Sequence, residues 1–233
     1  DYYGYGIYNI YVKNGSYLSN DFSRPTRTTS TTVTGIYMTT SGAGNVIENN
    51  RIHDLFPAFT AASTSTMYGI YCAAAGTVAQ PTRIVNNMIY NINGLFNGSI
   101  YGIYNSSSAN MNCWHNTIAL DNTTQTAGLA YAIYQTGAAT GISFRNNMIT
   151  LARGGSGAKV GLYYSTTTSG ITSNNNVVYV AGAGTGTRSI GSYGTTAYTT
   201  LATWQTANGG AYDANSVSAN PVYTNAAAGD LTP

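Results

Sequence analysis

Apolar and polar residues alternate in short runs along this chain, and the runs recur about every 30 residues. The first kind of run has the form Tyr-Gly-Ile-Tyr, and its second residue, usually Gly, stands at positions 6, 35, 69, 102, 132 and 161. Alternation with a period of two is typical of β-strands, and no segment carries the sustained apolar stripe of a helix. A strand unit repeated at this spacing predicts a solenoid, a propeller or an array.

A second kind of run, built around a pair of residues that are mostly Asn, follows five of these copies. Apolar residues stand mostly three positions before the second Asn and two positions after it, so each repeat is expected to form a strand, a bend, a strand, a loop and a strand. Asn tolerates a left-handed backbone better than other residues with a side chain, so the second Asn is expected to make the bend. The bend residues are Asn50, Asn87, Asn116, Asn147 and Asn176.

If the repeats stack as coils, the bend residues lie above one another, and their side-chain amides can donate and accept along the stack. The sequence therefore predicts an asparagine ladder. The position before the bend holds Asn in four of the repeats and His115 in the remaining one. His115 is accordingly interpreted as a substituted member of that row and not as a catalytic base.

With these two signatures the chain resembles the right-handed parallel β-helices of pectate-lyase-like proteins, over roughly residues 5–182. The Gly-Ile-Tyr and Asn-Asn-Met-Ile motifs and the closing run 220–231 are similar to sequences found in large secreted and cell-surface proteins of Bacteroidota. The resemblance implies an all-β, single-stranded solenoid of about six to seven coils, located outside the cell or on its surface. It also implies a fragment of a longer chain, since a sorting domain follows such a segment in that family.

The repeat runs nearly from end to end, so we expect one β-helix domain over residues 1–233. Residues 183–233 depart from the repeat and are expected to form an irregular terminal coil or cover. The run around Trp204 predicts a short helix or a cover that protects the exposed strand edge. Cys72 and Cys113 fall on neighbouring coils, where either a disulfide or two buried free thiols would fit, the thiols being the commoner state.

The composition limits the kinds of partner that the protein is expected to bind. Only 7% of residues are charged, against roughly 25% in ordinary soluble domains. A net charge of +2 without any basic run argues against nucleic-acid binding. No apolar stretch reaches the length of a membrane span, so membrane insertion is not expected.

The few acidic residues also limit the chemistry. Enzymes of this fold use carboxylates stacked on neighbouring coils, as a pair around the scissile bond or as a calcium cage. None of the seven acids here shares a phase with another on an adjacent coil. His53 and His115 stand on nonadjacent coils and make no metal spacing with the cysteines, and no Ser, His and acid set is apparent. The sequence therefore predicts no catalytic residue, no metal site and no cofactor.

The Tyr-Gly-Ile-Tyr runs offer a candidate binding surface. If Ile points into the core, alternation sends the Gly and the last Tyr outward, while the first Tyr, at positions 5, 68, 101 and 131, points inward. An outward row of Tyr beside Gly could stack on sugar rings, bind a protein surface, or only stabilise neighbouring coils. The predicted row consists of Tyr8, Tyr37, Tyr71, Tyr104, Tyr134 and Tyr163.

These observations favour a noncatalytic extracellular module, structural or adhesive, that presents Tyr, Thr and Asn to glycans, to surfaces or to neighbouring copies. A polysaccharide lyase or glycoside hydrolase of the β-helix class is the first alternative, with Glu48, Arg51, Asp54 and Arg83 as its candidate residues. The second alternative is a self-assembling filament subunit whose open coil ends stack between chains.

Overall fold

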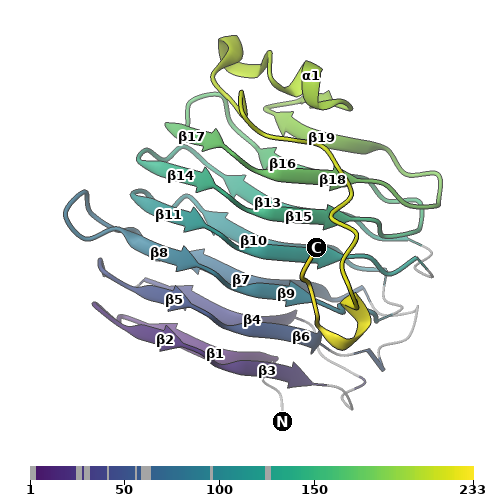
Figure 1. Cartoon of the computed structure of the whole chain (residues 1–233). Coiled ribbons are helices and arrows are strands. Elements are labelled where there is room, and N and C mark those ends of the chain that lie inside the picture. Colours follow the sequence, from purple (N-terminus) through teal and green to yellow (C-terminus); the bar gives the residue numbers. More distant parts are fainter. Residues whose placement is uncertain are drawn as a thin grey trace.

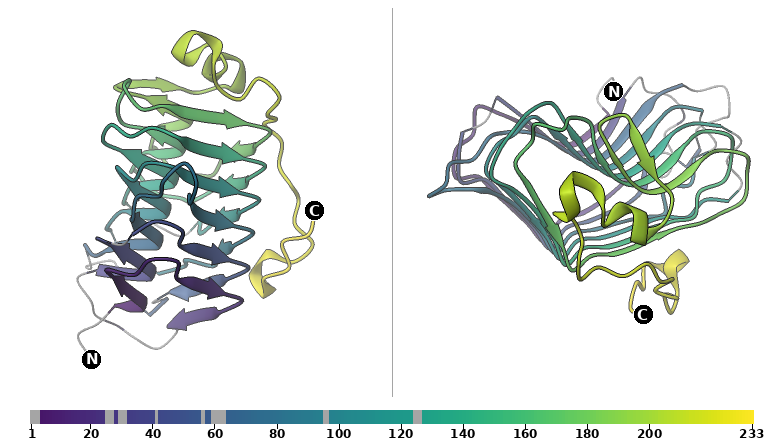
Figure 2. Two further views of the ribbon diagram at one scale, coloured as in Figure 1. Left: turned by 90° about the vertical axis from the view of Figure 1, so that its left-hand side faces the viewer. Right: turned by 90° about the horizontal axis from the view of Figure 1, so that it is seen from above.

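The computed structural model describes residues 4–24, 28, 32–40, 42–55, 57–58, 64–94, 97–123 and 127–233. Its strands form three parallel sheets that wind into a β-helix of about six turns, with coils of about 30 residues (Figure 1, Figure 2). The predicted fold class is confirmed. Among the described residues, no helix is long and apolar enough to span a lipid bilayer.

The Tyr-Gly-Ile-Tyr runs form strands of the first sheet. Its strands pair in parallel, except for the last, which turns back antiparallel. In spatial order they are β1 (Tyr5–Ile10), β4 (Thr32–Thr39), β7 (Thr66–Ala73), β10 (Ile100–Ser106), β13 (Ala130–Thr136), β16 (Lys159–Tyr164), β19 (Arg188–Tyr193) and β20 (Thr196–Tyr198).

The second and third sheets lie on either side of the Asn bend. The second contains β2 (Ser16–Leu18), β5 (Val46–Glu48), β8 (Thr82–Val85), β11 (Met111–Trp114), β14 (Ile142–Arg145) and β17 (Ile171–Asn174). The third contains β3 (Asp21–Arg24), β6 (Arg51–Leu55), β9 (Met88–Tyr90), β12 (Thr117–Leu120), β15 (Met148–Leu151) and β18 (Val177–Val180).

The core is built from one apolar row per sheet, because equivalent residues of successive coils lie above one another. Ile36, Ile70 and Ile103 show this for the first sheet, and all three are fully buried. Cys72 and Cys113 are buried free thiols within this core. Burial raises the pKa of the Cys72 thiol.

The asparagine ladder is confirmed. Each bend Asn before the last, Asn176, donates from Nδ2 to Oδ1 of the bend Asn in the next coil. The distances are 2.9 Å for Asn50 to Asn87 and for Asn87 to Asn116, 3.0 Å for Asn116 to Asn147 and 3.1 Å for Asn147 to Asn176. The ladder begins one coil earlier than the sequence signature, at Asn20, whose amide donates to Asn50 at 2.8 Å.

The left-handed backbone does not fall where it was expected. It belongs to the residue before each bend Asn, with φ of 58° at Asn49 and 55° at Asn86. His115 has the same conformation, with φ of 56°, and its Nε2 lies 3.3 Å from the side-chain nitrogen of Asn146. The outer residue therefore turns the chain, which leaves the second Asn free to face the interior and form the ladder.

The two ends of the solenoid differ. After β20 the chain forms α1 (Leu201–Trp204) and the 3₁₀ segment η1 (Ala207–Gly210), which cover the last coil (Figure 2). Trp204 is fully buried there, and a side chain at Gly191 would collide with its indole, since an added Cβ would lie 2.3 Å from Cε3. Glycine at 191 thus allows the indole to pack directly on the last strand.

Residues 214–233, which we call the strap, run back along the outside of the third sheet (Figure 1, Figure 2). The 3₁₀ segment η2 (Ala226–Ala228) lies near its end. Leu231 packs on Tyr90 and Ala119, and the Asn91 amide donates to the carbonyl of Ala227 at 2.8 Å. The strap therefore occupies part of this outer face.

Candidate functional site

The outward tyrosines form a continuous row on the first sheet, which we call the long file. Neighbouring rings in it lie nearly parallel, with centroids 4.5 to 5.1 Å apart and interplanar angles of 4° to 10°. Five steps of about 4.8 Å give the file a length of about 24 Å. Its members are the six predicted residues Tyr8, Tyr37, Tyr71, Tyr104, Tyr134 and Tyr163.

The first Tyr of the run does not point inward as expected. Tyr68, Tyr101 and Tyr131 form a second stack, the short file, on the same outer face. The two files touch edge to face, as between Tyr101 and Tyr104, whose ring centroids lie 5.0 Å apart at 90°. We call the two files together the tyrosine surface.

The small residue that follows the first tyrosine explains this error, because it faces the core. An added Cβ at Gly102 would lie 2.8 Å from Cγ2 of Ile118 and 2.6 Å from the carbonyl oxygen of Ala132, so this position faces the core. Gly102 and Ile103 are both buried, and the alternation is interrupted between them. Two consecutive buried residues interrupt the alternation, which places tyrosines three positions apart on one face, and β13 shows the same pattern with Ala132 at this position.

Stacking decides which parts of the rings remain available. Inside the long file, both faces of a ring are covered by the neighbouring rings, so ring edges and hydroxyls are left for solvent. Tyr8 at the end is 52% exposed, whereas Tyr71, Tyr104 and Tyr134 are half-buried. A sugar ring can therefore stack on an aromatic face only at the end of the file, and elsewhere it would meet edges and hydroxyls.

Tyr104 and Tyr131, on this surface, have raised pKa values and remain protonated at neutral pH. Burial, together with Tyr101 and Tyr163, raises the pKa of Tyr131 to about 12. Burial also raises the pKa of Tyr104, although a hydrogen bond with Thr136 opposes the shift. A phenol hydroxyl can both donate and accept a hydrogen bond, so the surface is polar along its hydroxyl edge.

Two basic residues start strands of the first sheet, but they do not charge its outer face. Lys159 is fully buried, and its Nζ donates to the carbonyls of Gly155 and Gly157 at 2.6 Å each. Arg188 turns in the same way and donates from Nη2 to the carbonyl of Gly184 at 2.7 Å. The cations are directed into glycine-rich corners of their own coils.

A cluster of charged side chains around His53 on the third sheet was not predicted from the sequence. His53 Nδ1 lies 2.7 Å from Asp54 Oδ2, and its Nε2 lies 2.6 Å from Asp21 Oδ1. The imidazole stacks on the Tyr90 ring at 4.9 Å, and the Tyr90 hydroxyl accepts a hydrogen bond from Arg51 Nη2 at 2.7 Å. Two local features bring the acids together: the register between β3 and β6 shifts after Phe22, and Asp54 has a left-handed backbone with φ of 46°.

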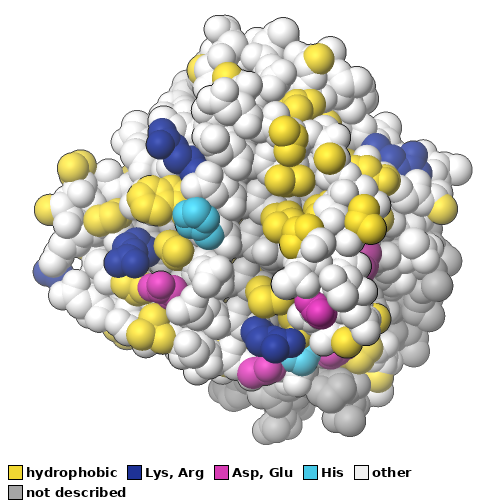
Figure 3. Space-filling view, viewed as in Figure 1, with side chains coloured by type: hydrophobic (Ala, Val, Ile, Leu, Met, Phe, Trp, Pro, Cys, Tyr) yellow, Lys and Arg dark blue, Asp and Glu magenta, His cyan; other side chains and the backbone are white. Residues whose placement is uncertain are grey.

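This cluster is not arranged as a catalytic acid pair. The imidazole fills the space between the carboxylates of Asp21 and Asp54, where a scissile bond would have to lie. The proposed enzyme residues also separate into two groups, because Glu48 pairs with Arg83 across 3.5 Å on the second sheet while Arg51 and Asp54 belong to the third. Figure 3 shows this side of the molecule, where the charged side chains gather in small groups.

Within the described part of the chain, no group of three or more His, Cys, Asp or Glu could hold a metal ion. Comparisons with protein-family models, curated proteins and solved structures gave no match to this sequence.

Proposed function

We propose that the protein is a noncatalytic adhesive module that binds neutral polysaccharide surfaces through the tyrosine surface. The observation that supports this most is the unbroken stack of six rings on one outer face, with their hydroxyls and edges in register along the solenoid. Aromatic edges and phenol hydroxyls provide a broad contact area at a low cost in side-chain entropy.

The geometry favours an extended ligand over a short oligosaccharide. Most ring faces are occupied by neighbouring rings, so a single sugar gains little from any one tyrosine. A polymer aligned with the file meets repeated hydroxyls over about 24 Å. Because no basic side chain is directed onto this surface in the described strands of the first sheet, a neutral polymer is the better match.

The finer identification is part of the same proposal. The two sequence signatures resemble pectate-lyase-like β-helices and secreted or cell-surface proteins of Bacteroidota, which supports a location outside the cell. A lyase or hydrolase is disfavoured because its candidate residues stand in two groups. A head-to-tail filament is disfavoured because Trp204 and α1 cover one end of the solenoid.

A pull-down on insoluble polysaccharides tests the proposal. We expect retention on cellulose or chitin particles that is insensitive to salt, because no charges contribute. The variant Tyr71→Phe/Tyr104→Phe keeps the stacked rings and removes two hydroxyls, so binding should weaken about 10-fold at unchanged thermal stability.

The variant Tyr179→Phe/Tyr198→Phe serves as the matched control, because it removes two hydroxyls away from the long file. Equal retention of the two double variants would contradict the proposal, as would retention on polygalacturonate only. Release of soluble sugars during the incubation would instead select the enzyme alternative.

A further inference from the structure

The lower end of the solenoid is formed by β1, β2 and β3, and none of the described residues covers it as α1 and η1 cover the upper end. Ile7, Tyr17 and Phe22 of this first coil are only partly buried. Their equivalents in the next coil, Ile36, Ile47 and Ile52, are fully buried. The difference arises because each later coil has another coil beneath it.

Exposed apolar side chains concentrate on the same coil. Four of the eight exposed large apolar residues of the described chain belong to residues 8–18, namely Tyr8 at 52%, Ile10 at 39%, Tyr11 at 78% and Leu18 at 50%. Single exposed apolar residues are ordinary, but a concentration of them on the terminal coil is consistent with an interaction surface at this end.

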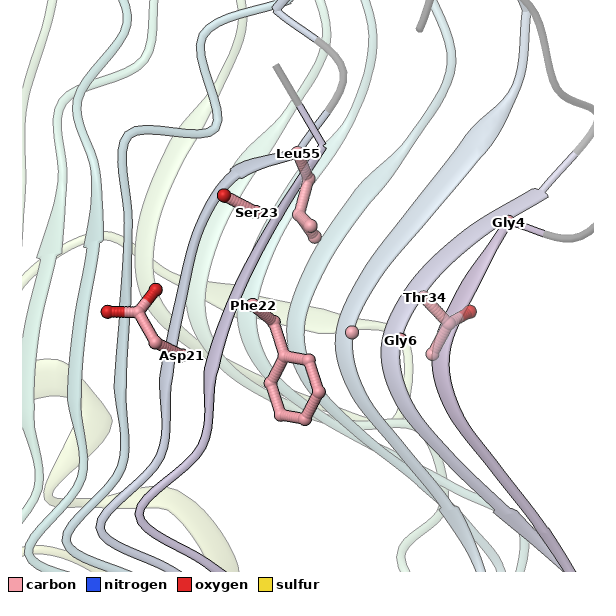
Figure 4. A pocket seen from close by; sticks show the side chains of 8 residues that line it. Gly4, Gly6, Asp21, Phe22, Ser23, Thr34 and Leu55 are labelled. Atoms are coloured by element: carbon pink, nitrogen blue, oxygen red, sulfur yellow. The ribbon is translucent and has the colours of Figure 1, made fainter. Parts of the chain in front are cut away.

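The same end contains a hollow of about 230 Å³. Phe22 and Leu55 line one side of it, and Gly6 and Thr34 line the other (Figure 4). Phe22 packs against Gly6 in the way that Ile118 packs against Gly102 in a later coil. The hollow therefore lies beside an apolar side chain that is only partly buried in this first coil.

The asparagine ladder has a polarity that specifies what can bind here. In every complete step, Oδ1 accepts from both the backbone N–H and Nδ2 of the bend Asn in the coil below, as Asn50 does for Asn20 at 3.0 and 2.8 Å. Each Nδ2 also donates downward to a carbonyl, as Asn50 does to Tyr17 at 2.9 Å. Within the described residues, Asn20 has neither the two donors nor the downward acceptor.

The upper end of the ladder needs an acceptor, whereas the lower end needs donors. At the upper end, Asp213 Oδ1 accepts from the last amide, that of Asn176, at 2.8 Å. A carboxylate accepts but does not donate, so the same solution is not available beneath Asn20. The lower end needs a group that offers donors and a carbonyl together.

We propose that the lower end docks a further coil of this same repeat, running parallel to β1, β2 and β3, with an Asn at its bend. This continues the coil-to-coil interface already repeated through the molecule. It would bury Ile7, Tyr17 and Phe22, and its bend Asn would donate to Asn20. A second copy of this chain does not offer such a coil in that orientation, because α1, Trp204 and Asp213 cover its upper edge.

A grafted chain provides the test. Insertion of a copy of residues 101–130 directly before Tyr5 places Tyr5 where Tyr131 follows that segment, which keeps the repeat in register. We expect the thermal midpoint to rise by about 5 °C or more. Amide exchange in β1, β2 and β3 should slow about 10-fold or more, because these strands become internal.

Two graft variants give the test its specificity. Asn116→Asp in the grafted copy replaces the donating amide by a carboxylate facing Asn20, so most of the gain should be lost. Asn112→Asp in the same copy makes the same chemical change at an outward position of β11 and should retain the gain.

The proposal is overturned if the graft leaves the midpoint and the exchange of β1–β3 unchanged, or if the two Asp variants behave alike. A native chain that forms closed dimers protecting β1–β3, without any gain on grafting, would overturn it in favour of a second copy.

Discussion

The side-chain amide of Asn176 donates to Asp213 Oδ1 at 2.8 Å, so the asparagine ladder ends in a carboxylate. Asp213 is fully buried and accepts three more hydrogen bonds, from Ser173 Oγ at 2.7 Å, Trp204 Nε1 at 2.7 Å and Ser216 Oγ at 2.6 Å. One side chain thus joins the ladder, the last coil and the terminal cover.

The substitution Asp213→Ala should destabilise the upper end strongly. Four buried donors would lose their acceptor together, and we expect a loss of about 3–5 kcal/mol in the free energy of unfolding. Denaturant unfolding measures the loss, and hydrogen exchange should show residues 188–212 opening first. Asp230→Asn, on an exposed loop, is the control and should have little effect. A variant as stable as the parent would contradict the assigned role of Asp213.

The interior of the ladder gives a second prediction. Asn116→Ala removes the acceptor of Asn87 and the donor to Asn147, and we expect a loss of about 2–4 kcal/mol. Asn146→Gly is the paired control, because φ at Asn146 is 55° and glycine tolerates that conformation. Thermal unfolding of the two variants should separate the inner ladder from the outer turn. Similar midpoints would mean that the ladder hydrogen bonds contribute little net stability.

The fold could be predicted because its cause is repeated. A coil that buries one apolar row per sheet must show the same pattern each time the chain returns, so a change in one copy does not hide the period. The bend Asn was found for the same reason. Its backbone conformation was misplaced by one residue, since two adjacent Asn give no sequence signal that distinguishes the turning residue from the buried one.

The candidate site was harder to predict, because it depends on departures from the ideal strand. Strict alternation places Tyr101 inside, whereas burial of both Gly102 and Ile103 puts its ring on the outer face beside Tyr104. The contact of Asp21 and Asp54 with His53 depends on a register shift and on a left-handed Asp54. Such local backbone changes follow from packing between coils, which a single repeat does not encode.

Tyrosine ionisation should give the protein an alkaline limit. The pKa of Tyr131 is raised to about 12 by burial and by nearby tyrosines, and burial raises the pKa of Tyr104 as well. A phenol in the unfolded chain ionises near pH 10. The folded state therefore retains protons that the unfolded state has lost, and the stability contributed is complete below about pH 10 and lost as the pH rises toward 12.

Denaturant unfolding over this pH range, followed together with phenolate absorbance, measures the effect. Tyr131→Phe/Tyr104→Phe should reduce the fall in stability, because these two phenols no longer ionise. Tyr198→Phe, outside the files, is the control. An equally steep fall in the double variant would place the alkaline limit in other groups.

Titration of Lys159 should make the protein more stable as the pH rises, at a lower pH than the loss caused by tyrosine ionisation. Burial, with Arg188 and Arg153 nearby, lowers the pKa of Lys159 to about 8, whereas the unfolded side chain titrates near 10.5. Between these values the unfolded chain binds more protons, so stability rises with pH; the destabilisation by Lys159 is complete below pH 8 and is relieved by about pH 10.5. Lys159→Met should remove this rise in stability with pH, as measured by denaturant unfolding. Lys13→Met changes the chain's other lysine, which is exposed, and should preserve the rise. If the rise persists in Lys159→Met, the buried ammonium is not its source.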